Sequence, residues 1–137
     1  MSLPLPQRLN DESGGFVIWW LIGLSGVAIL IFALVADGSR VMAGLNETSD
    51  VAQVAARAGA RMVNPSTGSL DATRAQAVAQ AELGTSGMTG AITIHGNEIT
   101  VTAATTIELP LLAIVGVDRR TVESTRTARA ISAEGPP

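Results

Sequence analysis

FVIWWLIGLSGVAILIFALVA, residues 16–36, is the stretch that decides the fold. It contains no charged side chain, and Ser25 is its single polar residue. A helix needs about 20 apolar residues to cross the hydrocarbon core of a bilayer. The stretch therefore predicts one transmembrane helix, with a short tail of residues 1–15 on one side of the bilayer and a domain of residues 37–137 on the other.

Four residues near the ends of this stretch are expected to mark the membrane interfaces. Trp19 and Trp20 lie within a turn of its start, and amphipathic rings favour the level of the lipid headgroups. Asp37 and Arg40 follow its end, one helical turn apart, and a local ion pair is the simplest interpretation of the two.

Two other interpretations of the stretch stay open. A core helix of a soluble protein can be as apolar, but it rarely has such sharp charged boundaries. A cleaved secretory signal has an apolar region of roughly 7–15 residues, which is shorter, although residues 41–43 (VMA) could serve as a loose cleavage site.

Composition limits what the domain after Asp37 can do. The 137-residue chain has a net charge of -3 and no cysteine, and its four aromatic residues all lie between Phe16 and Phe32. Without aromatic platforms or a basic surface, nucleic-acid binding is not expected. His95 is the sole histidine, and no phosphate-binding loop occurs. We therefore expect no enzyme activity, cofactor, metal or small-molecule substrate.

An amphipathic helix is predicted from Ser39 to Val63, ending before Pro65. One side of it carries mostly small residues at spacings of three and four. Because small side chains allow close approach, this side is either a docking face for a helix of another subunit or a surface that packs on the domain's own sheet. The proposed face consists of Ala52, Ala55, Ala56, Gly59 and Ala60. If no bend forms at Gly38 or Gly44, this helix and the membrane span make one rod.

The rest of the domain predicts a short helix and a small antiparallel sheet. Residues 70–83 favour a helix with Ser69 as N-cap and Gly84 as its stop. Residues 91–107 alternate apolar and polar side chains around Gly96 and Asn97, which predicts a hairpin with that two-residue turn. Pairing Ile94 with Ile99 then places all its apolar residues on one face.

A third strand is predicted at residues 121–130, although Arg126 falls on its apolar face. The apolar connection at residues 109–117 is interpreted as a loop or short helix that covers the sheet, or else as a contact with the membrane or a partner. The fold class is thus α+β and membrane-anchored, with a long N-terminal helix, a second short helix and about three strands.

Several motifs resemble a known family. These are DESGG at residues 11–15, an apolar span that ends in DGSR at residues 37–40, and DVAQVAARAGA at residues 50–60. In this order they resemble Tad or Flp pilus assembly proteins of the TadE/TadG kind, and the hairpin and the TARA ending at residues 127–130 resemble actinobacterial members.

The resemblance implies a pilin-like fold, with residues 1–15 as a cytoplasmic tail and residues 37–137 as an extracytoplasmic domain. It also implies the role of a minor pilin-like or assembly subunit of a Tad-type pilus or related secretion system. It also implies other pilus or secretion subunits as partners, through helix packing. Related pseudopilins are cleaved after Gly and carry Glu at the fifth mature position, where cleavage after Gly15 would leave Trp20. The alternatives are a membrane-anchored binding or signalling adaptor, and a secreted domain with a cleaved signal.

Overall fold

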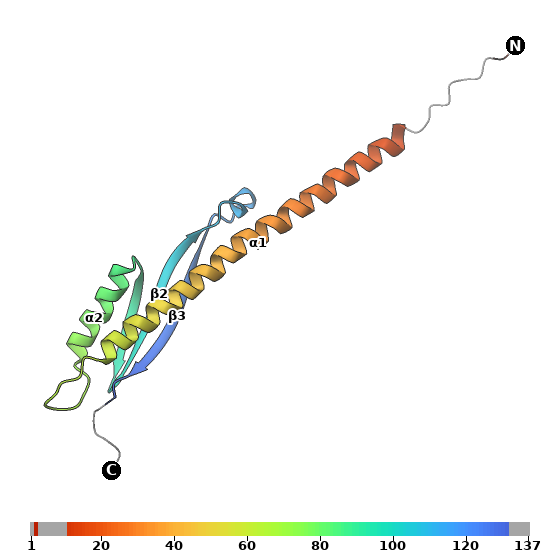
Figure 1. Cartoon of the computed structure of the whole chain (residues 1–137). Coiled ribbons are helices and arrows are strands. Elements are labelled where there is room, and N and C mark those ends of the chain that lie inside the picture. The colour runs from red at the N-terminus through yellow and green to blue at the C-terminus, as the bar shows by residue number, and fades with distance from the viewer. Residues whose placement is uncertain (1, 3–10, 132–137) are drawn as a thin grey trace.

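The computed structural model describes residues 2 and 11–131, so most of the predicted cytoplasmic tail lies outside the described residues. The main feature is a single helix, α1, from Asp11 to Ala60. Its 50 residues correspond to about 75 Å at 1.5 Å per residue. The helix passes through Gly38 and Gly44 without a break, so the predicted span and the predicted amphipathic helix form one rod (Figure 1).

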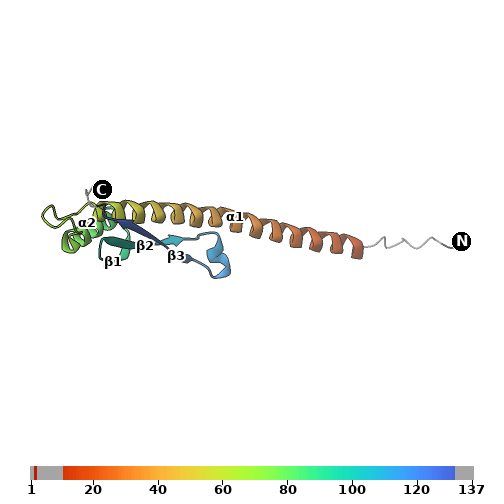
Figure 2. The ribbon, with the colours of Figure 1, turned by 90° about the horizontal axis from the view of Figure 1, so that it is seen from below.

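The remaining elements gather around the C-terminal half of α1. They are α2 (Ala72–Thr85), β1 (Thr89–His95), β2 (Glu98–Glu108), the short 3-10 helix η1 (Leu112–Val115) and β3 (Arg119–Arg129). The strands form one antiparallel sheet in the order β1-β2-β3. Figure 2 shows α1 running along the sheet, with α2 beside the β1 end and the N-terminal half of α1 projecting beyond the domain. The α+β class predicted from the sequence is confirmed.

The hairpin has the predicted register. Ile94 pairs with Ile99 and Ile92 with Val101, and Gly96 in the turn has a φ of 58°. Ile99 and Val101 are fully buried, whereas Thr100 between them is not. Local turn chemistry and side-chain alternation therefore agree in placing one face of β2 on the core.

The third strand is longer than predicted and pairs with β2 along its whole length, from Glu98 with Arg129 to Glu108 with Arg119. Arg126 does fall on the face toward α1, as the alternation required. Its side chain stays exposed and donates a hydrogen bond to the hydroxyl of Ser49 on α1. A long cationic side chain can thus occupy a strand position that faces the core, because its charged end reaches the exposed edge of the helix.

The ends of the helices differ from the prediction. Asp71, not Ser69, is the N-cap of α2, and its carboxylate accepts a hydrogen bond of 3.2 Å from the Arg74 N–H. Ser69 is instead held in the preceding loop, where its carbonyl accepts from the Asn64 N–H at 2.8 Å. At the other end, Gly84 lies inside the last turn of α2, which ends at Thr85.

The core is thin because it is built from small side chains. Its members on α1 face Ile99 and Val101 of β2 and the alanines of α2. Gly59 shows how close the packing is, since a Cβ there would lie 2.5 Å from Ile99 Cδ1 and 3.1 Å from the Ala75 carbonyl oxygen. With no aromatic ring in this core, stability depends on this close approach rather than on large buried areas.

Candidate functional site: the junction of the apolar helix and the domain

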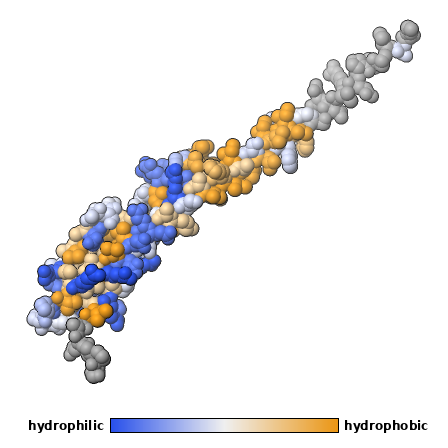
Figure 3. All heavy atoms as spheres, in the orientation of Figure 1, coloured by the Kyte–Doolittle hydropathy of each residue, from blue (hydrophilic) through white to orange (hydrophobic). Residues whose placement is uncertain are grey.

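The apolar residues in the N-terminal half of α1 are not covered by the rest of the chain. Of its most apolar 18-residue stretch, only 6% is buried against the rest of the chain, and within the part of the chain that the structure describes α1 is the one helix long and apolar enough to cross a membrane. Figure 3 shows these apolar residues gathered along the part of the rod that projects beyond the domain. A helix at the core of this chain would instead be covered.

Trp19 and Trp20 lie near the free end of this uncovered half and are 75% and 62% exposed. About 25 Å of helix separates Trp20 from Asp37, at 1.5 Å per residue. The two tryptophans therefore sit at one end of the apolar run and Asp37 at the other. The structure does not bring the four predicted interface residues into one site.

Asp37, which the sequence predicts at the membrane interface, is fully buried within the chain. Its Oδ2 accepts hydrogen bonds from the backbone N–H groups of Leu111 and Leu112, at 3.0 and 2.8 Å. Arg40 points to solvent, and the expected Asp37–Arg40 ion pair is wrong because the carboxylate is turned toward the β2–β3 connection. Asp37 joins the end of the apolar run to a loop more than seventy residues further along the chain.

The loop needs this acceptor because it has no cap of its own. Leu111 precedes η1 and makes no side-chain cap hydrogen bond, and no Ser, Thr, Asp or Asn occurs between Leu109 and Val117. The first N–H groups of a short helix have no partner within it. A carboxylate that accepts two of them forms charge-assisted hydrogen bonds, which are stronger than neutral ones. Oδ1 of Asp37 is buried without a hydrogen-bond partner among the described residues.

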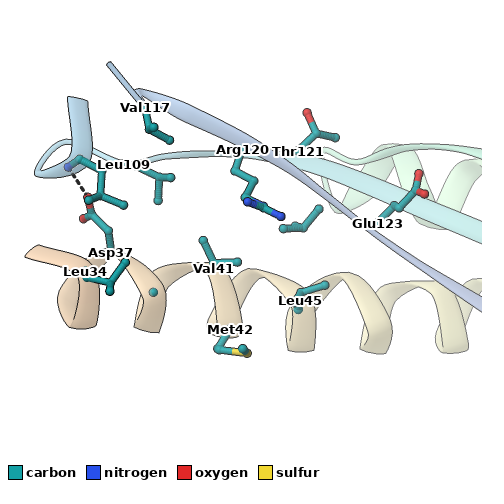
Figure 4. A pocket seen from close by; sticks show the side chains of 13 residues that line it. Leu34, Asp37, Val41, Met42, Leu45, Leu109, Val117, Arg120, Thr121 and Glu123 are labelled. Carbon is teal, nitrogen blue, oxygen red and sulfur yellow. Dashed lines mark hydrogen bonds between the residues drawn. The ribbon is translucent and has the colours of Figure 1, made fainter. Parts of the chain in front are cut away.

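A groove of about 490 Å³ lies beside this contact, between α1 and the ends of β2 and β3. Figure 4 shows Asp37 reaching across from α1 toward the loop, with Arg120 and Glu123 of β3 on the domain side. The lining is mostly apolar and includes Leu34, Val41, Leu45, Leu109, Leu112 and Val117. The groove therefore continues the apolar surface of α1 into the domain.

The five residues of the predicted docking face lie elsewhere, in the core. Ala52, Ala55 and Ala56 are at most 1% exposed, Ala60 is 8% exposed, and Gly59 packs against Ile99 and α2. The helix that docks on this face is α2 of the same chain, together with the sheet. The docking face for another subunit is thus corrected to an intramolecular packing surface, since the close approach that small residues allow is already used.

The connection at residues 109–117 does not cover the sheet as expected. Only Leu109 is buried, while Ile114 is 85% exposed and Val115 60%. Among the described residues, no group of three His, Asp or Glu side chains could hold a metal ion. The junction combines apolar contact with the buried carboxylate of Asp37, beside Arg120 and Glu123 of the groove, and this combination suits attachment and positioning.

Comparisons with known proteins give no further guide, because no family model matches the chain and neither a curated protein nor a solved structure is significantly similar to it.

Proposed function

We propose that this chain is a membrane-anchored structural subunit, of the minor pilin-like or assembly kind found in Tad or Flp pili and related secretion systems. The observation that carries the proposal is the continuity of α1. Its first half is apolar and uncovered, and its second half is the element on which α2 and the sheet pack. Anchor and domain thus share one rigid element.

The single-pass anchor has its N-terminus in the cytoplasm and the α+β domain outside. Residues 16–36 span the bilayer, with Trp19 and Trp20 near one interface and the Asp37 junction near the other. A flexible tether would let the domain explore many orientations. A continuous helix instead holds the domain at a set distance from the end of the span, which suits a building block of an assembly.

Assembly into a pilus or secretion machine is supported by the motif resemblance and by the division of α1. With its C-terminal half occupied by the chain's own core, the uncovered apolar half is the surface left for helix packing with other subunits. Gly23 and Gly26 in this half have nothing within 4 Å of an added Cβ, so they present small-residue positions to the bilayer. Small residues favour helix association in membranes.

Deletion of the gene in its host tests the assembly role. The expected result is loss of surface filaments, or of secretion through the related system, with recovery when the full chain is supplied. A Gly23→Leu variant that is inserted normally but does not restore assembly would place the contact on the uncovered half of α1. Leu24→Val, on the same half, is the matched control that should restore it. Unchanged filaments and secretion in the deletion strain would contradict the assembly role and favour an adaptor.

The mass of the mature protein tests the anchor against a cleaved signal. Cleavage after Ala43 would separate Asp37 from Leu111 and Leu112, and so remove the contact that holds the β2–β3 connection on α1. We expect a mature protein that retains residues 16–36. A mass that corresponds to a chain beginning after Ala43 would contradict the anchor.

A further inference from the structure

The tip of the β2–β3 connection, residues 111–117, is an exposed apolar surface without an explanation in the fold. Ile114 is 85% exposed, Val115 60%, Val117 44% and Leu111 37%. Four large apolar side chains are thus exposed within seven residues, and exposed apolar clusters on a protein surface mark interaction sites. The fold does not need them, since Leu109 is the one residue of this connection that is buried.

The tip lies beside the last turn of the apolar half of α1. Asp37 binds it directly through the N–H groups of Leu111 and Leu112. One turn earlier, Ala33 is only 7% exposed, whereas Ala28 in the same uncovered helix is exposed. Figure 1 shows the connection between β2 and β3 next to α1, and α1 and η1 are in contact. The low exposure of Ala33 therefore indicates that the tip covers helix surface within the apolar run. Leu34, also within that run, lines the groove together with Leu112.

The boundary between apolar and charged residues falls at the same level on both elements. On α1 the uncharged run ends at Asp37, and in the connection the uncharged residues are bounded by Glu108 and Asp118. The hydrogen bonds of Asp37 hold the end of the α1 run beside Leu111 and Leu112, and the Leu109 N–H, which donates to the Asp118 carbonyl at 2.8 Å, closes the base of the connection near them. A single plane can therefore separate the apolar side chains of both elements from the charged ones, as a bilayer interface does.

The charges next to this plane suit lipid headgroups. Arg40, Arg119 and Arg120 lie directly behind the apolar surfaces, and Arg119 and Arg40 are exposed. Acidic groups lie there too, but Asp118 approaches Arg119 only at 3.8 Å in an exposed pair, which holds the arginine weakly. Arginines beside an apolar patch can reach lipid phosphates while the patch enters the acyl boundary.

We propose that residues 111–117 dip into the outer interface of the same bilayer that α1 spans, as a second membrane contact. This inference rests on the proposed anchor. A single helix leaves the domain free to rotate about the helix axis and to tilt. Two contacts joined by Asp37 fix which face of the domain turns toward the membrane and which face, including α2, points away. The occupant of the patch is lipid, through acyl chains and phosphate groups.

Site-specific quenching tests the proposal, and the absence of cysteine from the chain makes it direct. Ile114→Cys, Leu24→Cys and Gln76→Cys are each labelled with an environment-sensitive fluorophore. The full chain is then placed in nanodiscs of phosphatidylethanolamine and phosphatidylglycerol that contain nitroxide-bearing lipids. Leu24 is the control within the span, and Gln76 on the exposed side of α2 is the control in water.

The expected result is loss of emission at Ile114 with a nitroxide near the headgroup end of the acyl chain, loss at Leu24 with a nitroxide deep in the chain, and none at Gln76. Emission at Ile114 that is quenched by aqueous iodide as strongly as at Gln76 would overturn the second contact while leaving the anchor intact. Emission at Leu24 that resists both nitroxides would overturn the anchor itself. If Ile114 is shielded from iodide and lipid nitroxides alike, protein covers the tip, which also overturns contact with lipid.

Discussion

Asp37 is the residue on which the attachment of the loop to α1 depends. Its Oδ2 serves two N–H groups of the β2–β3 connection, and its side chain is fully buried. The sequence places a carboxylate at the end of an apolar run, where a local ion pair with Arg40 is the simplest expectation. Nothing local shows that its partners are Leu111 and Leu112, because the contact forms only once β2 and β3 have paired. The absence of a capping residue in the loop is the one signal that an acceptor must come from elsewhere.

Asp37→Ala removes both hydrogen bonds of this contact. Leaving partly buried N–H groups without an acceptor costs about 1–3 kcal/mol, and the loss should be local, since the rest of the domain packs further along α1. Hydrogen exchange of the Leu111 and Leu112 amides should accelerate strongly while the amides of β2 near Ile99 keep their protection. Asp37→Asn keeps an acceptor oxygen and should have a smaller effect. Equal acceleration across the whole sheet would contradict a local role.

Ile99 and Thr100 test the face assignment of β2 by two neighbouring substitutions. Ile99→Asp places a carboxylate in a fully buried site without a partner, which costs several kcal/mol. Thr100 lies on the outer face of the sheet and shares a 2.9 Å hydrogen bond with Thr127, so Thr100→Asp should cost about 1 kcal/mol at most. Thermal unfolding followed by circular dichroism measures both. Similar losses from the two changes would show that the strand faces are misassigned.

At the scale of elements, the hairpin could be predicted because the residues that specify it are neighbours in the sequence. Gly96 and Asn97 specify the turn, and the alternation on either side specifies the register. The N-cap of α2 could not be chosen in the same way, since Ser69 and Asp71 are both good caps. The choice is made by the loop before it, in which Val63 and Leu70 form an isolated bridge.

The small-residue side of α1 shows a second limit of sequence reasoning. A partner helix and the chain's own sheet both require close approach of the backbone, so the pattern from Ala52 to Ala60 fits either. Tertiary packing decides between them, and it places α2 and β2 on this side. The exposed tip at residues 111–117 was ambiguous for the same reason, because an apolar loop is compatible with burial or with membrane contact.

Ala56→Leu tests the intramolecular packing of α1. Ala56 is 1% exposed, and overpacking a core typically costs about 1–3 kcal/mol, a large share of the stability of a small domain. The variant should unfold at a clearly lower temperature in detergent, as measured by circular dichroism. Val54→Leu, at an exposed position on the same helix, is the matched control and should unfold with the parent chain. An Ala56→Leu protein that is normally stable but no longer associates with other subunits would instead support this side of α1 as a docking surface.

The whole molecule is organised along α1, which carries an uncovered apolar half and a packed half (Figure 3). The long apolar helix could be predicted from length and composition, and the domain from periodicity, but their union in one continuous helix could not, because Gly38 and Gly44 permit a bend. The structure keeps both glycines helical. Gly44 lies so close to Ile107 that an added Cβ would collide with that side chain. At Gly38, an added Cβ would have nothing within 4 Å.

The central claim is that this rod anchors the chain in a membrane with the domain outside the cell's cytoplasm. The most direct measurement combines carbonate extraction of membranes with protease treatment of spheroplasts that carry a C-terminally tagged chain. We expect the protein to stay in the carbonate-washed membrane fraction and the tag to be removed by external protease. Release into the soluble fraction, or a tag that survives protease until the spheroplasts are lysed, would contradict the account.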